Sequence, residues 1–345
     1  MRRRLLEWYA HNRRDLPWRK SRDPYAIWVS EIMLQQTRVA VVVERYREFL
    51  LRFPTLVSLA LADEQEVLAM WSGLGYYRRA RMLHKTAQFV ASNLAGNLPN
   101  QPEQLRALPG IGSYTAAAVA SIAYGCAVAV VDGNVERVLC RFAGWEAASA
   151  RGSEVLLRRK IDDLAGQLLD AARPGDWNQA MMELGATVCT PRNPQCTACP
   201  LMAECKTRGE HKTPRRAPMS SRVAAYALSV RSAQSRRGSG ARDVLLEQRP
   251  ASATVMPGMW ELPMLLDFDV PEKELQMTLR HAIMQVNYYA RIRTVSERDV
   301  KRMTNAGGER RWVPLREAGS MALTGLARKV LTRAHLLPVL RPELC

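Results

Sequence analysis

The chain has 345 residues, of which 47% are hydrophobic and 24% are charged, and this composition excludes a mainly disordered protein. Because a typical domain has roughly 100–200 residues, the length predicts two domains. Lysine and arginine number 50 against 33 acidic residues, so the net charge is +17. This excess favours a polyanionic partner, nucleic acid above all, over an ordinary basic enzyme.

The first part of the chain, up to about residue 190, is predicted to be almost entirely helical. Apolar residues recur every three or four positions, as in Val39, Val42, Val43 and Tyr46. Prolines and glycines separate such segments at intervals of ten to twenty residues. We therefore expect a compact all-α region at 1–205, whose last part, 189–205, is a cysteine-rich loop.

The second part has a different pattern. Residues 206–222 are basic and aperiodic, which predicts a solvated linker, with contact to DNA phosphates as the alternative. Residues 223–345 predict a smaller α+β domain. Its first strand, 223–230, is expected to pair with 243–248, further strands are expected at 282–292 and 311–315, and a helix is expected at 323–337.

Neither part contains the roughly 18 unbroken apolar residues of a membrane span. At the start, Glu7 interrupts the apolar run that follows the first arginines, so we expect no signal peptide. These features predict a cytoplasmic protein, associated with the nucleoid in a bacterium, and no membrane partner.

Four of the seven cysteines lie together with the spacing C-x6-C-x2-C-x5-C. The cluster contains no histidine, and four protein ligands would leave no open position on a metal, so a structural site is expected. Four thiolates suit either zinc or a [4Fe–4S] cluster. The ligands would be Cys189, Cys196, Cys199 and Cys205.

Residues 108–115 form a glycine-rich turn in front of an alanine-rich helix. Gly110 and Gly112 permit unusual backbone angles, and they let a phosphate approach the N–H groups at the start of the helix. The turn predicts a DNA-binding hairpin or, alternatively, a plain corner between two helices.

Two carboxylates stand out from their surroundings. Glu31 lies in an apolar, amide-rich helical segment, where the pKa of a carboxyl group is raised and the group can remain protonated. Asp132 follows an apolar run at the start of a helix, where the helix dipole favours the ionised form. Such a pair suits a proton donor and an anion, whereas the alternatives are a surface residue and an ordinary helix cap.

The order of these motifs resembles that of the helix-hairpin-helix DNA glycosylases with an iron–sulfur cluster, most closely the MutY-type adenine DNA glycosylases. Ser-Glu-Ile-Met-Leu-Gln-Gln-Thr precedes Gly-Leu-Gly-Tyr-Tyr, Leu-Pro-Gly-Ile-Gly, Val-Asp-Gly-Asn-Val and the cysteine cluster. The resemblance implies a six-helix barrel with a helix-hairpin-helix, an iron–sulfur domain built from both ends of this region, and a [4Fe–4S] cofactor. It is dense over residues 5–205.

The resemblance also implies roles for individual residues. Glu31 would protonate adenine, Asp132 would stabilise the oxocarbenium-like sugar, and Tyr114 and Asn134 would orient Asp132 and the water. Bifunctional relatives carry a lysine at the position of Tyr114, and no lysine occurs between Gln101 and Arg159, so base removal without strand cleavage is expected. The residues that would line the adenine pocket are Arg14, Leu16, Trp18, Arg19 and Gln179. Gln36 and Tyr76 would enter the base stack as the adenine leaves it.

Residues 223–345 resemble the Nudix-like recognition domain of the same family, without the Arg-Glu-x-x-Glu-Glu segment that a working Nudix hydrolase needs. The family loop that reads 8-oxoguanine usually contains Phe-Ser-His, whereas this chain has Ile283-Met284-Gln285 after His281. One good base contact contributes about 1–3 kcal/mol of discrimination. We therefore expect weakened or altered preference for the lesion, with Gln285 as a substitute contact.

The expected function is excision of adenine mispaired with 8-oxoguanine or guanine in double-stranded DNA, by a monomer. A thymine glycosylase acting on T·G mismatches is the nearest alternative, and a non-catalytic binder of damaged DNA is the other. Such thymine glycosylases generally lack both the glutamate of the catalytic helix and the extra C-terminal domain. Retention of Glu31 together with Asp132 argues against a mere binder.

Overall fold

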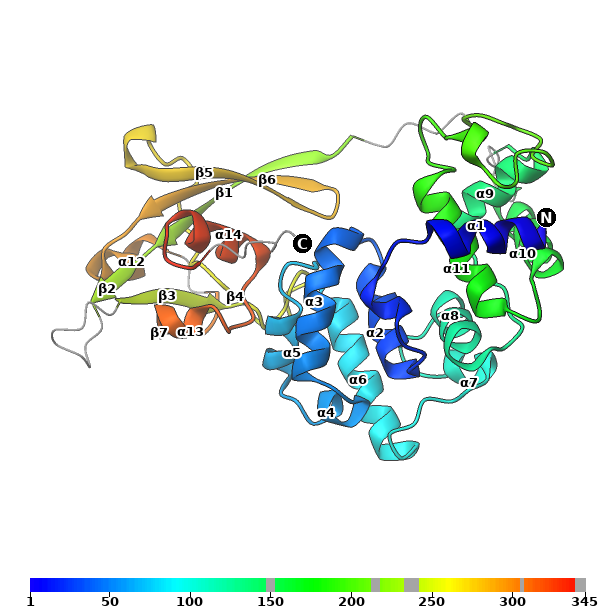
Figure 1. The fold of residues 1–345 in the computed structure, drawn as a ribbon. Helices are drawn as coiled ribbons and strands as arrows, with labels where there is room; N and C mark the ends of the chain where they lie inside the picture. The colour runs from blue at the N-terminus through cyan, green and yellow to red at the C-terminus, as the bar shows by residue number, and fades with distance from the viewer. Residues whose placement is uncertain (147–152, 212–217, 233–241, 305–306, 339–345) are drawn as a thin grey trace. The chain divides into compact units, whose positions relative to one another are not determined.

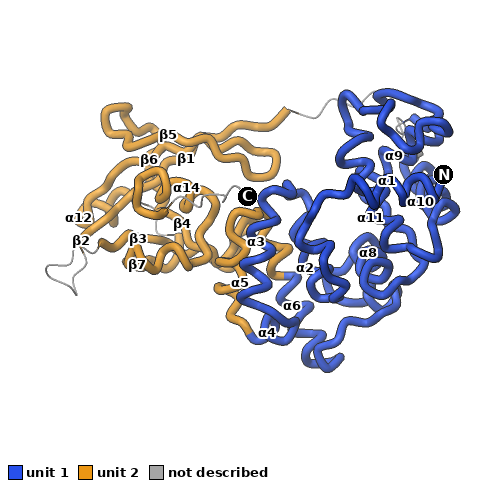
Figure 2. The backbone as a smooth tube through the Cα atoms, viewed as in Figure 1, with its two compact units in different colours: residues 1–61, 82–215 blue, residues 62–81, 216–345 orange. Residues whose placement is uncertain are grey.

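The computed structural model describes residues 1–146, 153–211, 218–232, 242–304 and 307–338. These residues fall into two compact units (Figure 2): Met1–Leu61 with Met82–Arg215, and Ala62–Arg81 with Arg216–Cys345. The second unit therefore contains a short segment, 62–81, taken from within the helical part of the sequence. No described helix combines the length and apolarity needed to span a bilayer.

The first unit is all-helical, which confirms the predicted class (Figure 1). Apart from the 3₁₀ turns η1 (Pro17–Arg19) and η2 (Cys196–Ala198), its elements in chain order are α1 (Arg2–Asn12), α2 (Pro24–Leu34), α3 (Val39–Arg52), α4 (Leu56–Ala60), α6 (Arg78–Asn93), α7 (Pro102–Arg106), α8 (Ser113–Tyr124), α9 (Gly133–Ala143), α10 (Ser153–Leu168) and α11 (Pro174–Thr187). Helix α6 begins in the segment that belongs to the second unit.

Local sequence explains where the key helices begin and end. Asp23 caps α2 by accepting a hydrogen bond from the Tyr25 amide, and Pro24 occupies the first turn, where its missing N–H costs nothing. Helix α8 ends at Gly125, which has a positive φ of 72°. Asp132 caps α9. The extended stretch between α8 and α9 therefore ends at the side chain that carries the predicted chemistry.

The two ends of the first unit share one hydrophobic core. Leu5, Leu6 and Tyr9 of α1 pack with apolar side chains of α9, α10 and α11 and with Leu201 of the cysteine-rich loop. Burial of these apolar side chains is the main favourable term for this packing. It holds the cysteine-rich loop against the helix that Asp132 begins.

The second unit is an α+β structure, as predicted. Two sheets form, with strand orders β1–β6–β5 and β2–β3–β4, and β7 pairs with β3. The remaining elements are α5 and η3 and three helices on the sheets. In chain order they are α5 (Glu64–Met70), β1 (Ser220–Leu228), β2 (Val230–Ser232), β3 (Arg242–Gln248), β4 (Trp260–Glu261), η3 (Glu272–Glu274), β5 (Leu275–Ile283), β6 (Val286–Thr294), α12 (Glu297–Met303), β7 (Arg310–Pro314), α13 (Leu315–Ala318) and α14 (Gly325–Arg333).

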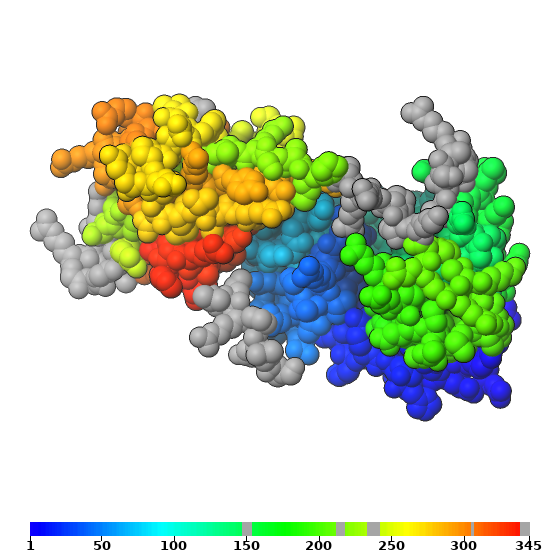
Figure 3. Space-filling model, turned by 90° about the horizontal axis from the view of Figure 1, so that it is seen from above, coloured from blue at the N-terminus to red at the C-terminus, as the bar shows by residue number. Residues whose placement is uncertain are grey.

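Alternating side chains of β1 enter two cores. Ala224, Tyr226 and Leu228 pack into the cluster that contains α14, whereas Ala225 and Ala227 pack into the cluster that contains Val300 of α12. The period of two along a strand explains this division. Strands β5 and β6 form much of the outer face of this unit seen in Figure 3, in yellow to orange.

The predicted pairing of 223–230 with 243–248 is wrong for most of its length. Strand β1 pairs in parallel with β6, and only the short β2 pairs antiparallel with β3, through Val230 opposite Val244. The chain changes sheets at Ser229, whose carbonyl accepts a hydrogen bond from the Leu245 amide. Both sides of β1 are buried at its end, so neighbouring sequence could not specify its partner.

Candidate active site

A cavity of about 860 Å³ opens in the first unit between α2, α8, α9 and α11. Most of the residues predicted for catalysis, base binding and the hairpin line it together. They are Arg14, Leu16, Trp18, Arg19, Glu31, Gln36, Gly110, Gly112, Tyr114, Asp132, Asn134 and Gln179. Its volume lies in the range of small-molecule pockets.

Glu31 is buried in this cavity, with 6% of its surface exposed. Its Oε2 accepts a hydrogen bond of 2.7 Å from the Tyr114 hydroxyl. Burial raises the pKa of Glu31 to about 7, against the lowering effect of that hydrogen bond, and the nearby Asp132 raises it further. The protonated form of Glu31 is therefore available near neutral pH. Tyr114 contacts Glu31 here, whereas the resemblance had implied a role for it at Asp132.

Asp132 is fixed by three hydrogen bonds. Its Oδ1 accepts from the backbone amides of Asn134 and Val135, at 2.9 and 2.7 Å, and its Oδ2 accepts from Asn134 Nδ2 at 2.9 Å. Three donors at the start of a helix fix the position of this carboxyl group. The cap interpretation and the functional interpretation thus coincide, because the cap aims a fixed anion into the cavity.

A second charged cluster faces the same cavity and was not predicted from the sequence. Glu183 is 1% exposed and accepts hydrogen bonds from Arg14, at 2.9 and 2.7 Å, and from Arg19, at 2.8 Å. Burial alone would raise the pKa of Glu183, but the two arginines outweigh it and hold the pKa at about 2. Little in the sequence indicated this cluster, because a glutamate such as Glu183 is common in a helix like α11.

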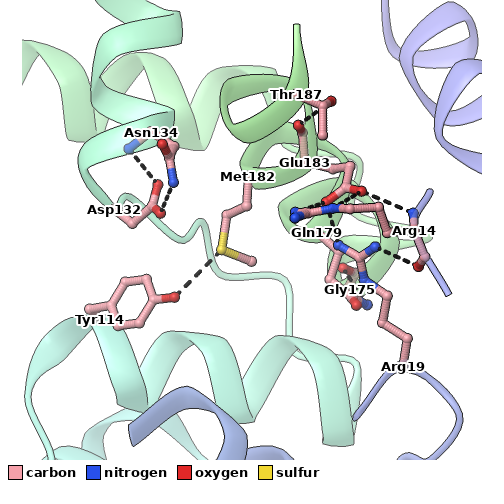
Figure 4. Close-up of polar contacts among 10 residues, drawn as sticks. All are labelled: Arg14, Arg19, Tyr114, Asp132, Asn134, Gly175, Gln179, Met182, Glu183 and Thr187. Atoms are coloured by element: carbon pink, nitrogen blue, oxygen red, sulfur yellow. Dashed lines mark hydrogen bonds and ion pairs between the residues drawn. The ribbon is translucent and has the colours of Figure 1, made fainter. Parts of the chain in front are cut away.

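Figure 4 shows how these groups are arranged. Tyr114 and Asp132 lie on one side of Met182, and the Glu183 cluster lies on the other. The Met182 sulfur lies 3.5 Å from the Tyr114 hydroxyl. Gln179, one turn before Glu183, donates weakly to the Gly175 carbonyl at 3.4 Å. The cavity therefore has Tyr114 and Asp132 at one end and the hydrogen-bonded Glu183 cluster at the other.

The aromatic and aliphatic lining residues also serve the core. Trp18 and Leu16 are each only 7% exposed, and the Trp18 ring packs edge-on against Tyr46 with 5.6 Å between centroids. Gln36 has a left-handed backbone with φ of 56°. Such a conformation is uncommon for a residue other than glycine and needs support from its surroundings.

The glycine-rich turn joins α7 to α8 and contributes to the rim of the cavity. Gly110 has a positive φ of 74°, and an added Cβ would lie 2.9 Å from the Met82 side chain. An added Cβ at Gly112 would meet nothing within 4 Å. The positive φ and the contact with the Met82 side chain therefore favour glycine at Gly110, while Gly112 leaves the first turn of α8 open to approach.

The four predicted metal ligands line one small pocket together with Arg141. Arg141 is buried, and its Nη1 lies 3.4 Å from the Cys189 sulfur. A buried cation among four thiols fits a group that carries negative charge. No group of His, Cys, Asp or Glu side chains in the described parts of the chain is arranged to hold a single metal ion. The donor set itself fits a thiolate-bound cluster.

Arg137 connects Asp132 to the cysteine-rich loop, a link that the sequence did not indicate. Its Nη2 donates to Asn134 Oδ1 at 2.9 Å, and its Nε donates to the Cys189 carbonyl at 2.9 Å. Asn134 in turn holds Asp132. The loop thereby stabilises the residue that orients the carboxylate.

The remaining predicted residues lie in the second unit. Tyr76 belongs to the segment 62–81 and is 49% exposed. His281 lies on β5, with its ring against the first turn of α14 at Gly325. Met284 and Gln285 form the turn between β5 and β6, where Met284 is 70% exposed and has a φ of 54°.

Comparisons with known proteins find similarity to base excision DNA repair proteins. The model of the HhH-GPD superfamily of base excision DNA repair proteins matches residues 29–162. The chain is 51% identical over 213 residues to the adenine DNA glycosylase of Homo sapiens, covering 59% of this chain and 38% of that one. It is 40% identical over 318 residues to the adenine DNA glycosylase of Arabidopsis thaliana, covering 81% of this chain and 49% of that one. The chain thus spans about half or less of the length of these relatives.

Solved structures give the same picture. A thermostable thymine-DNA glycosylase matches with a TM-score of 0.54 and 30% identity, over 60% of this chain and 94% of that chain. A trapped endonuclease III–DNA covalent intermediate matches with a TM-score of 0.50 and 22% identity, over 59% and 92%. The second match concerns the fold alone.

Proposed function

We propose that this chain is an adenine DNA glycosylase of the HhH-GPD superfamily of base excision DNA repair proteins, and that it excises adenine from DNA. The proposed substrate is adenine opposite 8-oxoguanine or guanine in a duplex. The observation that carries this proposal is the buried Glu31, with a pKa of about 7, in the same cavity as the fixed anion Asp132.

Adenine inside a duplex cannot reach a buried acid, so the base must first leave the stack. Extrusion costs a few kcal/mol, least where the base is already mispaired. The cavity of about 860 Å³ is roomy enough for a purine. Arg14, Arg19 and Glu183 supply fixed donors and acceptors that suit the polar edge of adenine.

The proton donor is Glu31. Transfer of its proton to N7 of adenine makes the base a better leaving group, and the bond between the sugar and N9 then breaks with its electrons moving to the base. A pKa near the working pH suits this role, since the acid is then both populated and able to give up its proton. Ionised Glu31 keeps the hydrogen bond from Tyr114.

The cationic sugar that remains needs an anion beside it. Asp132 serves this purpose, as carboxylates do in glycoside cleavage. Its three hydrogen bonds fix it in place before the reaction, so little reorganisation is needed when positive charge develops. A water molecule then adds to the sugar and gives up a proton, which restores the acid form of Glu31.

Strand cleavage is not part of the proposed reaction. Bifunctional relatives use a lysine amine at the position of Tyr114. Among the described residues that line the cavity none is a lysine. The product is therefore an abasic site in an intact strand.

A [4Fe–4S] cluster bound by Cys189, Cys196, Cys199 and Cys205 is proposed as a structural group. When bound, it would tie together the ends of the cysteine-rich loop. Arg141 would offset its negative charge, and Arg137 would connect the loop to Asn134. The purified protein should accordingly be brown and contain iron; a colourless preparation with zinc would contradict the cluster.

We also propose that discrimination between 8-oxoguanine and guanine is weaker here than the Phe-Ser-His loop of the family provides. The turn at Met284 and Gln285 lacks the hydroxyl and imidazole of that loop. Equal single-turnover rates and affinities opposite both bases would support this proposal. A strong preference for the lesion would reject it.

The decisive experiment is an excision assay on duplexes carrying adenine opposite 8-oxoguanine, guanine, cytosine or thymine, together with thymine opposite guanine. Hot alkali should cleave the strand that carried adenine, and no cleavage should occur without alkali. Excision of thymine instead would favour the alternative function, a thymine glycosylase. This alternative is considered because the chain is 30% identical to a thermostable thymine-DNA glycosylase of known structure. Binding without any alkali-sensitive product would identify a non-catalytic binder.

A further inference from the structure

The turn between α5 and α6 presents an aromatic side chain in an unusual conformation. Gly73 and Gly75 have φ values of 93° and 68°, and Tyr76 itself has φ of 46°. A residue with a Cβ rarely adopts this left-handed region, and it persists only where neighbouring contacts enforce it. The Tyr76 ring is nevertheless 49% exposed. Its own burial therefore cannot be what holds the turn.

Several of the contacts that hold this turn come from Arg79. Its guanidinium carbon lies 5.3 Å from the centroid of the Trp71 ring and 5.7 Å from that of Tyr76. Its Nη2 donates hydrogen bonds to the carbonyls of Leu74 and Gly75, at 3.0 and 3.1 Å. One planar side chain thus contacts two aromatic rings and binds the backbone between them.

The other side of this arrangement is rigid. Trp71 is fully buried, and its Nε1 donates to the Gly75 carbonyl at 3.1 Å. Arg79 therefore connects an exposed ring to a fixed indole. Burial lowers the pKa of Arg79 to about 10, so it keeps its charge near neutral pH. Cation–π contacts strengthen when the cation is desolvated in this way.

We propose that Arg79 is a positioning residue that fixes the Tyr76 ring in advance for insertion into the DNA base stack as adenine leaves it. This inference rests on the proposed function, since it concerns the extrusion step. A ring whose orientation is fixed before binding loses little conformational entropy on binding, so more of the stacking energy supports extrusion. Without Arg79, the ring would sample other orientations and the turn would relax.

A double-mutant cycle tests the proposal on the full-length protein. Arg79→Met removes the planar charge and both carbonyl contacts, and Tyr76→Ala removes the ring that Arg79 is proposed to position. Alone, Arg79→Met should slow single-turnover adenine excision about tenfold, equivalent to about 1.4 kcal/mol. In the Tyr76→Ala background it should slow excision less than about twofold, because the ring it positions is absent.

Extrusion is measured separately with 2-aminopurine in place of adenine. Its fluorescence rises on leaving the stack, and this rise should be smaller for Arg79→Met than for the parent. The apparent pKa of excision should not change, since Glu31 is untouched. Arg78→Met is the matched control, because Arg78 is an exposed neighbour of the same charge. Arg78→Met should change neither the single-turnover excision rate, with or without Tyr76→Ala, nor the rise in 2-aminopurine fluorescence.

Additive effects of the two substitutions would overturn the proposal, since Arg79 would then act without Tyr76. If Arg79→Met fails to fold by circular dichroism, Arg79→Lys replaces it in the cycle. Lysine keeps the charge but cannot span the two carbonyls as a planar fork, so a smaller, still non-additive loss is expected. An inactive parent protein would instead reject the proposed function, which separates the two failures.

Discussion

Replacing Glu31 by glutamine offers a test in which stability and activity must change together. The side chain is nearly isosteric and can still accept the Tyr114 hydroxyl, but it carries no charge at any pH. In the parent protein the pKa of Glu31 rises from its ordinary 4.5 to about 7 on folding, chiefly through burial. Folding therefore favours the protonated form. Its contribution to stability is fully present below pH 4.5 and is lost as the pH rises through 7.

The magnitude follows from these two values. Each unit of pKa corresponds to about 1.36 kcal/mol, so the difference between the two pKa values lowers the free energy of unfolding of the parent by about 1 kcal/mol at pH 5 and about 3 kcal/mol at pH 8, relative to low pH. The free energy of unfolding of Glu31→Gln, minus that of the parent, should thus rise by about 2–3 kcal/mol between these pH values. Denaturant titrations at each pH measure this difference, in which the other titrating groups cancel.

Glu31→Gln should lower the excision rate, although it raises the relative stability at high pH. Loss of a general acid lowers the rate by a factor of about 10²–10⁴, while affinity for the mispaired duplex should persist because no phosphate contact is removed. In the parent, the rate should fall about tenfold per pH unit above 7, as protonated Glu31 disappears. Glu103→Gln is the control, since Glu103 is exposed on α7. A stability difference that does not depend on pH would refute the reasoning. So would an excision rate in the parent protein that does not change up to pH 9.

Two further predictions concern the groups around these carboxylates. Tyr114→Phe removes a hydrogen bond that stabilises ionised Glu31, so the alkaline limb of the excision profile should move to higher pH; an unchanged or lowered apparent pKa would contradict this contact. Gly185→Ala in α11 should destabilise the fold and slow excision, because the new Cβ would lie 2.7 Å from the Asn134 side chain and 3.0 Å from its carbonyl oxygen. Gly166→Ala in α10 is the matched substitution, because an added Cβ there would meet nothing within 4 Å. It should raise the stability of the fold, measured by thermal melts, by about 0.5–1 kcal/mol. Equal effects of the two substitutions would exclude the steric explanation.

Local chemistry explains why the residues proposed for the reaction could be selected from the sequence. Glu31 is conspicuous because a carboxylate is out of place in an apolar helix, and Asp132 because it stands where an apolar run meets a helix start. The cysteine spacing likewise indicates a shared site without any coordinates. Each of these signals depends on residues only a few positions apart in the sequence, where steric and electrostatic rules act directly.

Long-range partners gave no comparable signal. The Glu183 cluster joins residues about 165 positions apart, and each member alone looks like an ordinary charged side chain. Strand β1 was assigned the wrong neighbour because its buried end fits either sheet equally well by pattern. In the sequence, nothing distinguishes Arg79 from its neighbour Arg78; only the folded turn places the Arg79 guanidinium over the Trp71 and Tyr76 rings.

The amino-acid order alone thus determined the helical and mixed character of the two parts, and it predicted an acid, an anion and four thiol ligands that remain proposals. Only the tertiary structure decided that Tyr114 contacts Glu31, that two arginines hold Glu183, and that Arg137 connects Asn134 to the cysteine loop. The physical reason is that helix caps and periodicity depend on near neighbours. Hydrogen-bond partners and desolvation depend instead on which distant segments the packing of apolar side chains brings together.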